Sequence, residues 1–385
     1  MGSSSNIAEV KIWRIPTFSV KEEWRAEDSL WPTVPINFLV RVTLENGIFG
    51  IGEISTQLWY LNETPEQIQS AIQLYDDCLR GADIANVALC HELMLKTYGG
   101  GSIGARGARS GVDMAIWDAI GKLYSVPVFK LLGGGNPAPI PLMFCTYETT
   151  PERVAKECEQ ALSRNYSAIK VKVGESLLAA GWSHRALVAE NDKIAAALEV
   201  IPKEIMVDAD ANQAWGNAGS AVAALRVFQG HSNLSIEQPL HLDDLSGSAY
   251  VRKTAGFPLI LDESVWSAEA MIAILKAEAC DRVVCKINRL GGLSEARKVV
   301  AISEAAGVGV SVDTAPYTIL GDTSACHLAA SCKTTYPFDE GHLSMINISG
   351  PNPFSGGAKS ENGNISLPDA EGYGIEVDWD IVEGW

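Results

Sequence analysis

Five short, β-prone runs, each with a charged residue at or near its end, constrain this fold more than any other feature. In chain order they read AIKVKVG, MVDADANQAW, SIEQP, LDES and VVCKINRLGG. Their charged positions are Lys172, Asp210, Glu237, Asp262 and Lys286, at successive intervals of 38, 27, 25 and 24 residues. A strand with its return helix takes about 25 to 40 residues, so the spacing predicts one charged group per βα unit.

The period of a β-strand places these charges on one face. In AIKVKV the apolar side chains share one face, and Lys170 and Lys172 share the other. A strand buried on both sides is normally apolar throughout, so two inward lysines require negative groups opposite them. Asp208 and Asp210 repeat the same spacing on the next run. Opposed charges at strand ends are typical of the C-terminal mouth of a (β/α) barrel, where such barrels keep their active sites. Solvated strand ends are the alternative for any single run.

The composition limits the partners of the chain. It has 385 residues, of which 47% are hydrophobic, enough for a large core and two domains. Acidic residues outnumber basic ones by 17, so we expect no nucleic-acid partner and no anionic membrane surface. An acidic substrate therefore requires strong positive charge close to its site.

The cysteines and the first residues bear on the compartment. Eight cysteines are scattered without a CxxC pair, which indicates reduced, buried thiols. The start, MGSSSNIAEV, has no apolar stretch of the kind found in signal peptides. No segment approaches the roughly 20 apolar residues of a membrane span. We therefore expect a cytoplasmic protein.

Three segments are predicted along the chain. Residues 1–135 carry strands and helical patterns and form an α+β cap. Residues 136–348 alternate strand and helix and form the barrel, in which Pro151 to Ser163 is one helix. Residues 349–385 are rich in turns, regain strand character, and return to the cap. Within the cap, FLVRVTLENGIFGIGE predicts a hairpin that turns at Asn46-Gly47.

Two aromatic-rich loops of the cap are candidates for a lid over the barrel mouth. They span residues 18–35 and 55–60, and both are otherwise polar. Their large aromatic residues are Trp24, Trp31, Trp59 and Tyr60. We expect these loops to close over the site and to select the substrate.

Asp210, Glu237 and Asp262 are three carboxylates at three successive strand ends. Oxygen ligands without an accompanying His or Cys favour a hard cation, and Mg²⁺ is the first candidate. Lys172 and Lys286 would then face a bound substrate from two directions, and a lysine beside a cation loses its proton more readily. This set indicates removal of the proton α to a carboxylate, with the enediolate stabilised by Mg²⁺.

The same motifs resemble a known family. The order KVK, DAN, EQP, DES and K-x-N-x-x-GG resembles the enolase superfamily, in its muconate-lactonizing branch. GIFGIGE and SGVDMAIWDAIGKLYSVPVFKLLGG look like the capping domain of that family, and EGYGIEVDWD like its C-terminal return. The resemblance implies a modified TIM barrel, (β/α)7β, with an N-terminal α+β capping domain that the C-terminal tail completes.

The resemblance also implies roles for individual residues. Lys172 and Lys286 become the acid/base pair, and Asp210, Glu237 and Asp262 become the Mg²⁺ ligands. Lys170 becomes a supporting charge for the substrate carboxylate, while Asn212 and Glu263 lie beside the metal. From their strand-end positions, Asp313, Asp339 and Glu340 are candidates to face the substrate, and His327 is expected to pack on a helix.

Two departures narrow the resemblance. SVDTAPYTILGD has no histidine at the end of the seventh strand, which argues against the Lys/His variant of the mandelate-racemase branch. FDEGHL lacks the D-x-D that would indicate a dipeptide epimerase.

The leading hypothesis is a Mg²⁺-dependent racemase or epimerase that acts on a small carboxylate, an amino-acid derivative among the candidates, in a homo-oligomer. Muconate-type cycloisomerisation and dehydration use the same proton abstraction and stay open. A Schiff-base barrel enzyme with Lys170 or Lys172 as nucleophile is a different reading. The non-enzyme reading is a catalytically silent, ligand-binding barrel.

Overall fold

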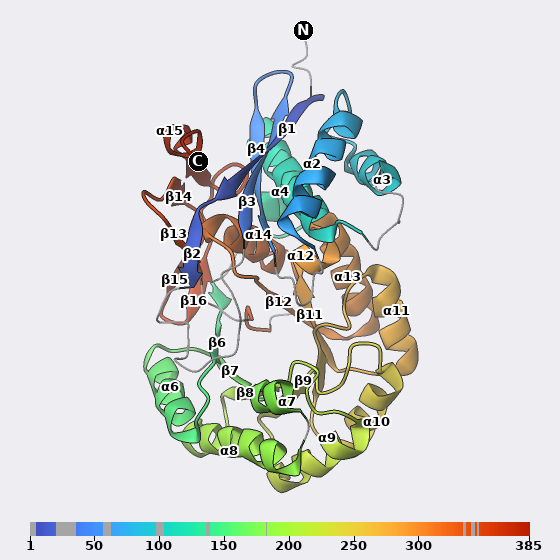
Figure 1. Ribbon diagram of the computed structural model, residues 1–385, viewed down its shortest axis with the longest axis vertical. Helices are drawn as coiled ribbons and strands as arrows, with labels where there is room; N and C mark the ends of the chain where they lie inside the picture. The colour runs from blue at the N-terminus through green and yellow to red at the C-terminus, as the bar shows by residue number, and fades with distance from the viewer. Residues whose placement is uncertain are drawn as a thin grey trace.

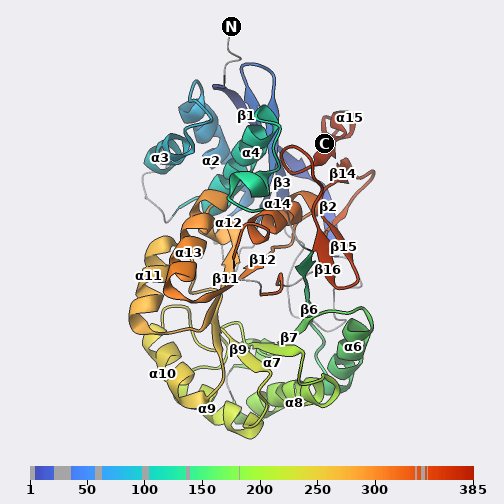
Figure 2. The ribbon, with the colours of Figure 1, turned by 180° about the vertical axis from the view of Figure 1, so that it is seen from behind.

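The structure is a computed structural model in which a barrel lies below a smaller α+β layer (Figure 1). It describes residues 5–20, 36–56, 63–97, 104–135, 139–181, 183–333, 336–339, 343–344 and 346–385. In both views the final strands lie beside the N-terminal strands, above the barrel (Figures 1 and 2). Among the described residues, no helix combines the length and the apolar character needed to cross a membrane.

The barrel is built on one parallel sheet of seven strands, in the order β12-β11-β10-β9-β8-β7-β6. The strands are β6 (Met143–Thr146), β7 (Ala168–Lys172), β8 (Met206–Asp210), β9 (Leu234–Glu237), β10 (Leu259–Leu261), β11 (Arg282–Lys286) and β12 (Gly309–Asp313). Each strand pairs with its sequence neighbour, as expected when every strand is followed by a helix that returns the chain.

A short eighth strand segment closes the barrel. Phe338 forms a parallel bridge with Leu142, just before β6, and Asp339 forms one with Asp313, at the end of β12. The amide of Met143 donates to the carbonyl of Phe338 at 2.9 Å, and the amide of Asp339 donates to the carbonyl of Val312 at 2.8 Å. The predicted (β/α)7β barrel is therefore confirmed.

Helices cover the outside of the sheet (Figure 2). They are α6 (Pro151–Ser163), α7 (Glu175–Ala180), α8 (His184–Val200), α9 (Ala218–Leu225), the 3-10 turn η2 (Arg226–Phe228), α10 (Leu245–Ala255), α11 (Ala268–Ala277), α12 (Ile287–Leu290), α13 (Leu293–Ala306) and α14 (Ile319–Ala329). Polar N-caps begin many of them; the side chain of Thr150, for example, accepts the amide of Arg153 at the start of α6. The helix predicted from Pro151 to Ser163 is confirmed with the same bounds.

The cap packs three antiparallel strands against helices. Its main elements are β1 (Ile7–Ile15), β3 (Asn37–Leu44), β4 (Phe49–Ser55), α2 (Pro65–Leu79), α3 (Val87–Thr97), α4 (Arg106–Leu123) and α5 (Val128–Leu131). The predicted hairpin is confirmed, and Gly47 takes a φ of +88° in its turn. Helix α4 lies so close to β4 that a Cβ at Gly52 would meet the carbonyl oxygen of Gly111 at 2.1 Å.

The C-terminal segment runs back along the barrel and onto the cap. Its elements, with their partners, are β13 (Ile346–Ile348) on β2 (Thr17–Val20), β14 (Phe354–Gly356) on β17 (Ile375–Val377), β15 (Lys359–Glu361) with β16 (Asn364–Ser366) on β5 (Ile140–Pro141), and α15 (Trp379–Val382). Trp379 packs on Trp13 and Phe49, with ring centroids 5.5 and 5.4 Å apart. The tail thus contacts the cap, while the domain boundaries at 135 and 348 stay predictions.

A buried carboxylate joins the cap to the barrel. Glu53, at the end of β4, is 0% exposed. It accepts hydrogen bonds from the amide and the hydroxyl of Thr318, at 3.0 and 2.7 Å, and from the amide of Gly321 at 2.9 Å. Asn37 and Ser55 both donate to the carbonyl of Pro316 at 2.9 Å. These bonds fix the loop that follows β12.

Candidate active site

Charged side chains gather at the carboxyl ends of the barrel strands. The strand register places Lys172 beside Asp210 and Asp210 beside Glu237. On the other side of the barrel it places Lys286 beside Asp313, which in turn bridges to Asp339. The sequence-predicted residues therefore lie at one end of the sheet, as expected for parallel strands.

We define the strand-end cluster as twelve charged residues that are each at most 7% exposed. They are Asp208, Asp210, Glu237, Asp262, Glu263, Asp313 and Asp339, with Lys170, Lys172, Arg282, Lys286 and Arg289. Seven carboxylates against five cations leave two negative charges in excess when all are ionised. Buried charge is costly without compensation, so the cluster favours a further cation.

The two predicted bases lie at opposite ends of the predicted metal ligands. Lys172 Nζ donates to Oδ2 of Asp210 at 2.7 Å. Lys286 Nζ donates to Oδ2 of Asp262 at 3.0 Å and lies 2.8 Å from Oδ2 of Asp313. Since Glu237 comes from the strand between Asp210 and Asp262, the two lysines approach this carboxylate series from its two sides.

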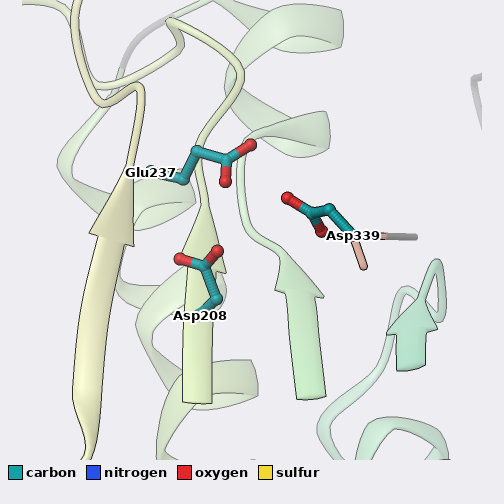
Figure 3. A group of neighbouring side chains, drawn as sticks. All are labelled: Asp208, Glu237 and Asp339. Carbon is teal, nitrogen blue, oxygen red and sulfur yellow. The ribbon is translucent and has the colours of Figure 1, made fainter. Parts of the chain in front are cut away.

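Lys170 lies in the interior of the cluster. It precedes Lys172 by two residues on β7, so both side chains point to the same face of the strand. Its Nζ donates to Glu237 Oε1 at 2.8 Å and to Asp339 Oδ2 at 3.0 Å. Figure 3 shows Asp208, Glu237 and Asp339 converging, with oxygens that lie within 4.8 Å of one another. Lys170 already supplies a cation between two of them, so this deeper group differs from the predicted metal ligands. Its predicted role toward a substrate carboxylate stays a prediction.

Asp208 contacts a buried arginine. Its Oδ2 accepts from Arg282 at 3.2 Å, and Ser235 donates to its other oxygen at 3.4 Å. Burial raises the pKa of Asp208 to about 6, although Arg282 and Lys170 oppose the shift. Asp208 is thus the main partner of Arg282, below the level of the strand ends.

The carboxylates differ in how readily they ionise. Burial raises the pKa of Glu237 well above its usual range, in spite of Lys170. Burial, with the charges of Asp262 and Asp210, raises the pKa of Glu263 to about 7. Burial alone would do the same to Asp262, but Arg289 and Lys286 hold its pKa below the ordinary value.

Two amide side chains fix the turns that carry the carboxylates. The side-chain oxygen Oε1 of Gln238 accepts from the backbone amides of Asp262 and Ser264, at 2.9 and 3.2 Å. The backbone amide of Asn212 donates to Oδ1 of Asp210 at 3.0 Å, and its side-chain Nδ2 donates to Glu263 at 3.3 Å. Asn212 and Gln238 both have positive φ, at 40° and 35°, which allows these turns to fold back.

The donor set fits a hard divalent cation. Oε2 of Glu237 and Oε2 of Glu263 are buried and have no hydrogen-bond partner among the described residues. Glu237 lies opposite Asp210 in register, and the amide of Asp262 is tied to the residue that follows Glu237. These oxygens, without His or Cys in the cluster, suit Mg²⁺.

The sequence did not reveal the roles of three residues in or beside the cluster. Arg289 binds Oδ1 of Asp262 at 2.5 Å from helix α12, and Arg282 and Gln238 act as described above. K-x-N-x-x-GG contains Arg289, so its position was visible but its partner was not. Asp339 was noted only as a strand-end candidate. Glu340 and the aromatic residues of the lid prediction lie outside the described residues.

Two family models match the chain. The mandelate racemase/muconate lactonizing enzyme N-terminal domain matches residues 33–133, and the enolase C-terminal domain-like model matches residues 153–381. The chain belongs to the enolase superfamily. Within the superfamily it falls in the muconate-lactonizing-like branch, as the motifs predicted.

Curated relatives of this superfamily member include epimerases, a racemase, cycloisomerases and a dehydratase. It is 29% identical over 341 residues to the L-Ala-D/L-Glu epimerase of Bacillus subtilis, covering 88% of each chain. It is 28% identical over 353 residues to the N-succinyl-L-Arg/Lys racemase of Bacillus cereus, covering 90% of this chain and 89% of the relative. A muconate cycloisomerase of Acinetobacter lwoffii and a cis-3-hydroxy-L-proline dehydratase of Roseibium aggregatum are similar at 28% and 25%.

Solved structures share the same architecture. The dipeptide epimerase of Enterococcus faecalis V583, solved with Mg and the dipeptide L-Leu-L-Tyr, superposes with a TM-score of 0.83 and 25% identity. The match covers 96% of this chain and 99% of that one. The fold of this enolase-superfamily chain is therefore that of a known class of enzymes.

Proposed function

We propose that this chain is a Mg²⁺-dependent racemase or epimerase that removes and returns the proton α to a carboxylate. The observation that carries the proposal is the placement of Lys172 and Lys286. They pair with Asp210 and Asp262, the outer members of the proposed ligand series. A substrate carbon above that series would have one lysine on each face.

Asp210, Glu237 and Asp262 would hold the cation. When bound, Mg²⁺ supplies Lewis-acid stabilisation of the negative charge that develops on the substrate carboxylate. Asn212 and Gln238 hold the backbone turns of these ligands in place. Glu263 contributes a further carboxylate next to the site, held by Asn212.

Each lysine serves as base on its own face of the substrate. Lys172 takes the α-proton of one enantiomer, and Lys286 returns a proton to the opposite face; the reverse reaction exchanges the roles. Asp313 holds Lys286 from the side away from Asp262. Lys170, enclosed by Glu237 and Asp339, adds positive charge beneath the substrate carboxylate.

Alanine variants of the two lysines test the proposal. Each pure enantiomer is incubated in D₂O with Mg²⁺-loaded protein, and loss of the α-proton signal is followed by ¹H NMR. Lys172→Ala should still exchange the α-proton of one enantiomer with deuterium but should lose exchange with the other enantiomer. Lys286→Ala should show the reverse preference. General acid–base groups contribute about 10² to 10⁴ in rate, so the lost exchange should fall at least that far.

The outcome also separates the proposal from its neighbours. Net racemisation should disappear in both variants, because each direction requires both lysines. If one variant loses exchange of both enantiomers while the other retains both, the reaction uses a single base.

We infer that the substrate is a small carboxylate, with N-acyl amino acids and dipeptides as the first compounds to screen. The similarity to an N-succinyl amino-acid racemase and to dipeptide epimerases supports this choice. The missing D-x-D after Phe338 favours N-acyl amino acids over dipeptides. Proline derivatives and sugar acids complete the panel.

Cycloisomerisation or dehydration is the second candidate function. A muconate cycloisomerase and a hydroxyproline dehydratase are similar to the chain over comparable lengths. Both reactions begin or end with the same proton transfer and need one base. The single-base result above, followed by detection of a lactone or a dehydrated product, would support this candidate.

A further inference from the structure

The backbone carbonyl of Lys172 is held by another buried lysine. Lys193, on α8, donates from Nζ to the carbonyl oxygen of Lys172 at 2.8 Å and is 2% exposed. The contact lies at the last residue of β7, where the chain leaves the sheet. An ammonium group therefore fixes the main chain of the residue that carries the proposed base.

Glu190 completes this contact from the same helix. It is 0% exposed, and its Oε2 lies 2.6 Å from Nζ of Lys193. Its other oxygen accepts the amide of Ser176 at 2.9 Å. The pair thus grips the β7–α7 connection at two points, Lys172 and Ser176.

The residues between these two points are also held. Trp215 donates from Nε1 to the carbonyl of Val173 at 3.0 Å. At Gly174 the chain passes so close to the next connection that a Cβ would meet the carbonyl oxygen of Ala211 at 2.3 Å. The backbone of Val173 and Gly174, directly after Lys172, is therefore held by contacts from the β8–α9 connection.

A buried ion pair is not the simplest way to stabilise this helix. Replacing such a pair by apolar residues is often neutral or stabilising, because two charges must leave water. Helix α8 already packs through apolar side chains such as Leu187, Ile194 and Ala197. The Lys193–Glu190 pair does something that an apolar pair could not do. It binds the carbonyl of Lys172 and the amide of Ser176, beside the proposed base.

We propose that Lys193, held by Glu190, is a positioning residue that aims Lys172 at the substrate. The proposal rests on the two-lysine function proposed above. A displacement of about 1 Å at a reacting group can cost on the order of 10²-fold in rate, so the last residue of β7 must be held tightly. The second lysine, Lys286, is held by other groups and should not depend on Lys193.

This asymmetry gives a test that a merely structural role would not pass. In Mg²⁺-loaded, full-length Lys193→Met, the enantiomer deprotonated by Lys172 should exchange its α-proton in D₂O about 10- to 10²-fold more slowly. The other enantiomer should exchange at the wild-type rate. Equal slowing of both enantiomers, or of neither, would overturn the proposal.

A neighbouring side chain on α8 provides the matched control. Asn191 donates to the carbonyl of Ala224 at 3.0 Å, which ties the same helix to α9 instead of to Lys172. Asn191→Ala should therefore leave the ratio of the two exchange rates unchanged. Should Lys193→Met fail to fold, the double variant K193M/E190Q, which buries no uncompensated charge, carries the test.

A second readout works without a substrate. Competitive acetylation with acetic anhydride, followed by peptide mass spectrometry, compares the reactivity of Lys172 with that of Lys286. Lys193→Met should change this ratio and Asn191→Ala should not; an unchanged ratio in Lys193→Met contradicts the positioning role. Absence of exchange in the wild-type protein with every compound would instead count against the proposed function.

Discussion

At the scale of single residues, the barrel mouth is held together by pairs of buried, opposite charges. Every lysine and arginine of the strand-end cluster contacts a carboxylate, and Asp262 is contacted by both Lys286 and Arg289. Burial nevertheless leaves Glu237 and Glu263 with raised pKa values. Within the part of the cluster that the structure describes, these two residues also carry buried oxygens without a hydrogen-bond partner. Their side of the cluster therefore suits a bound cation.

Two overlapping groups of carboxylates can be told apart by metal affinity. Asp210, Glu237 and Asp262 are our predicted ligands. The second group is Asp208, Glu237 and Asp339, so the two groups have Glu237 in common. Asp210→Asn and Asp262→Asn should weaken Mn²⁺ or Mg²⁺ binding by more than the roughly 10- to 100-fold typical of an outer partner. Asp208→Asn and Asp339→Asn should stay within about that range. Isothermal titration calorimetry on the metal-free proteins measures the metal affinity of all four variants. If Asp208→Asn and Asp339→Asn weaken binding more than the other two, the metal site lies deeper in the barrel, beside Lys170.

The charged strand ends were predictable because strand period and barrel geometry act locally. Lys170, Lys172 and Asp210 could be placed on one face from the alternation of their neighbours alone. The partner of Arg289 could not be predicted in this way. It reaches Asp262 from a different βα unit, and such contacts depend on how helix α12 turns after β11.

At the scale of elements, helix α14 shows how a buried histidine can act as structure. His327 packs on a helix, as predicted, and is 0% exposed. Its Nδ1 accepts the amide of Phe129 at 3.0 Å, and its ring lies between Phe129 and Tyr373. Burial lowers the pKa of His327 to about 3. The neutral ring therefore joins α14 to α5 and to the C-terminal segment.

This histidine should make stability depend on pH. In the unfolded chain it binds a proton below about pH 6.5, whereas the folded protein keeps it neutral down to about pH 3. Stability is therefore fully present above pH 6.5 and decreases as the pH falls. Between pH 7 and pH 5 this one group should lower the free energy of unfolding by about 2 kcal/mol.

Urea unfolding of the wild-type protein and of His327→Asn at both pH values measures the effect. The asparagine oxygen can still accept the amide of Phe129 but takes up no proton. The variant should lose about 2 kcal/mol less than the wild-type protein over this interval. Equal losses in the two proteins would show that His327 is not kept neutral by the fold.

Elements with a strong local signal were predicted with the right type and bounds. Helix α6 has Thr150 as its cap, proline at its first position and a regular apolar face. The eighth strand is different, because Phe338 and Asp339 are the residues with a bridge in its described part, 336–339. Its position in the chain could be predicted from the number of βα units before it. The contact of Asp339 with Lys170 could not.

At the scale of the whole molecule, Glu53 couples two hydrophobic cores. One core lies within the cap, and the larger one fills the barrel and reaches cap residues such as Leu39 and Ile51. Glu53 crosses from the first to the loop after β12 with several charge-assisted hydrogen bonds. Removing it should weaken the whole structure and the link between its parts.

Glu53→Ala should lower the free energy of unfolding by about 3 kcal/mol or more, because several buried donors lose their acceptor. Differential scanning calorimetry should also show the cap and the barrel unfolding in more separate transitions. Asp369→Ala is the matched control, since its ion pair with Lys130 also joins distant parts of the sequence but is exposed. That change should cost less than about 1 kcal/mol. Comparable losses in both variants would refute a special role for Glu53.

The tilted contact between the rings of Trp379 and Trp13 has a consequence for how the protein is made. Arg41 lies over both rings, at 4.8 Å from Trp13 and 4.5 Å from Trp379. The N-terminal part is synthesised first, and Trp379 follows the entire barrel in the sequence. Trp13 and Phe49 therefore lack their aromatic partner until the barrel has been synthesised. During that interval Trp13 and Phe49 of the nascent cap lack their contact with Trp379. A cap fragment expressed alone would keep that face permanently, and chaperone binding to the new chain should decline only after residue 379 has left the ribosome.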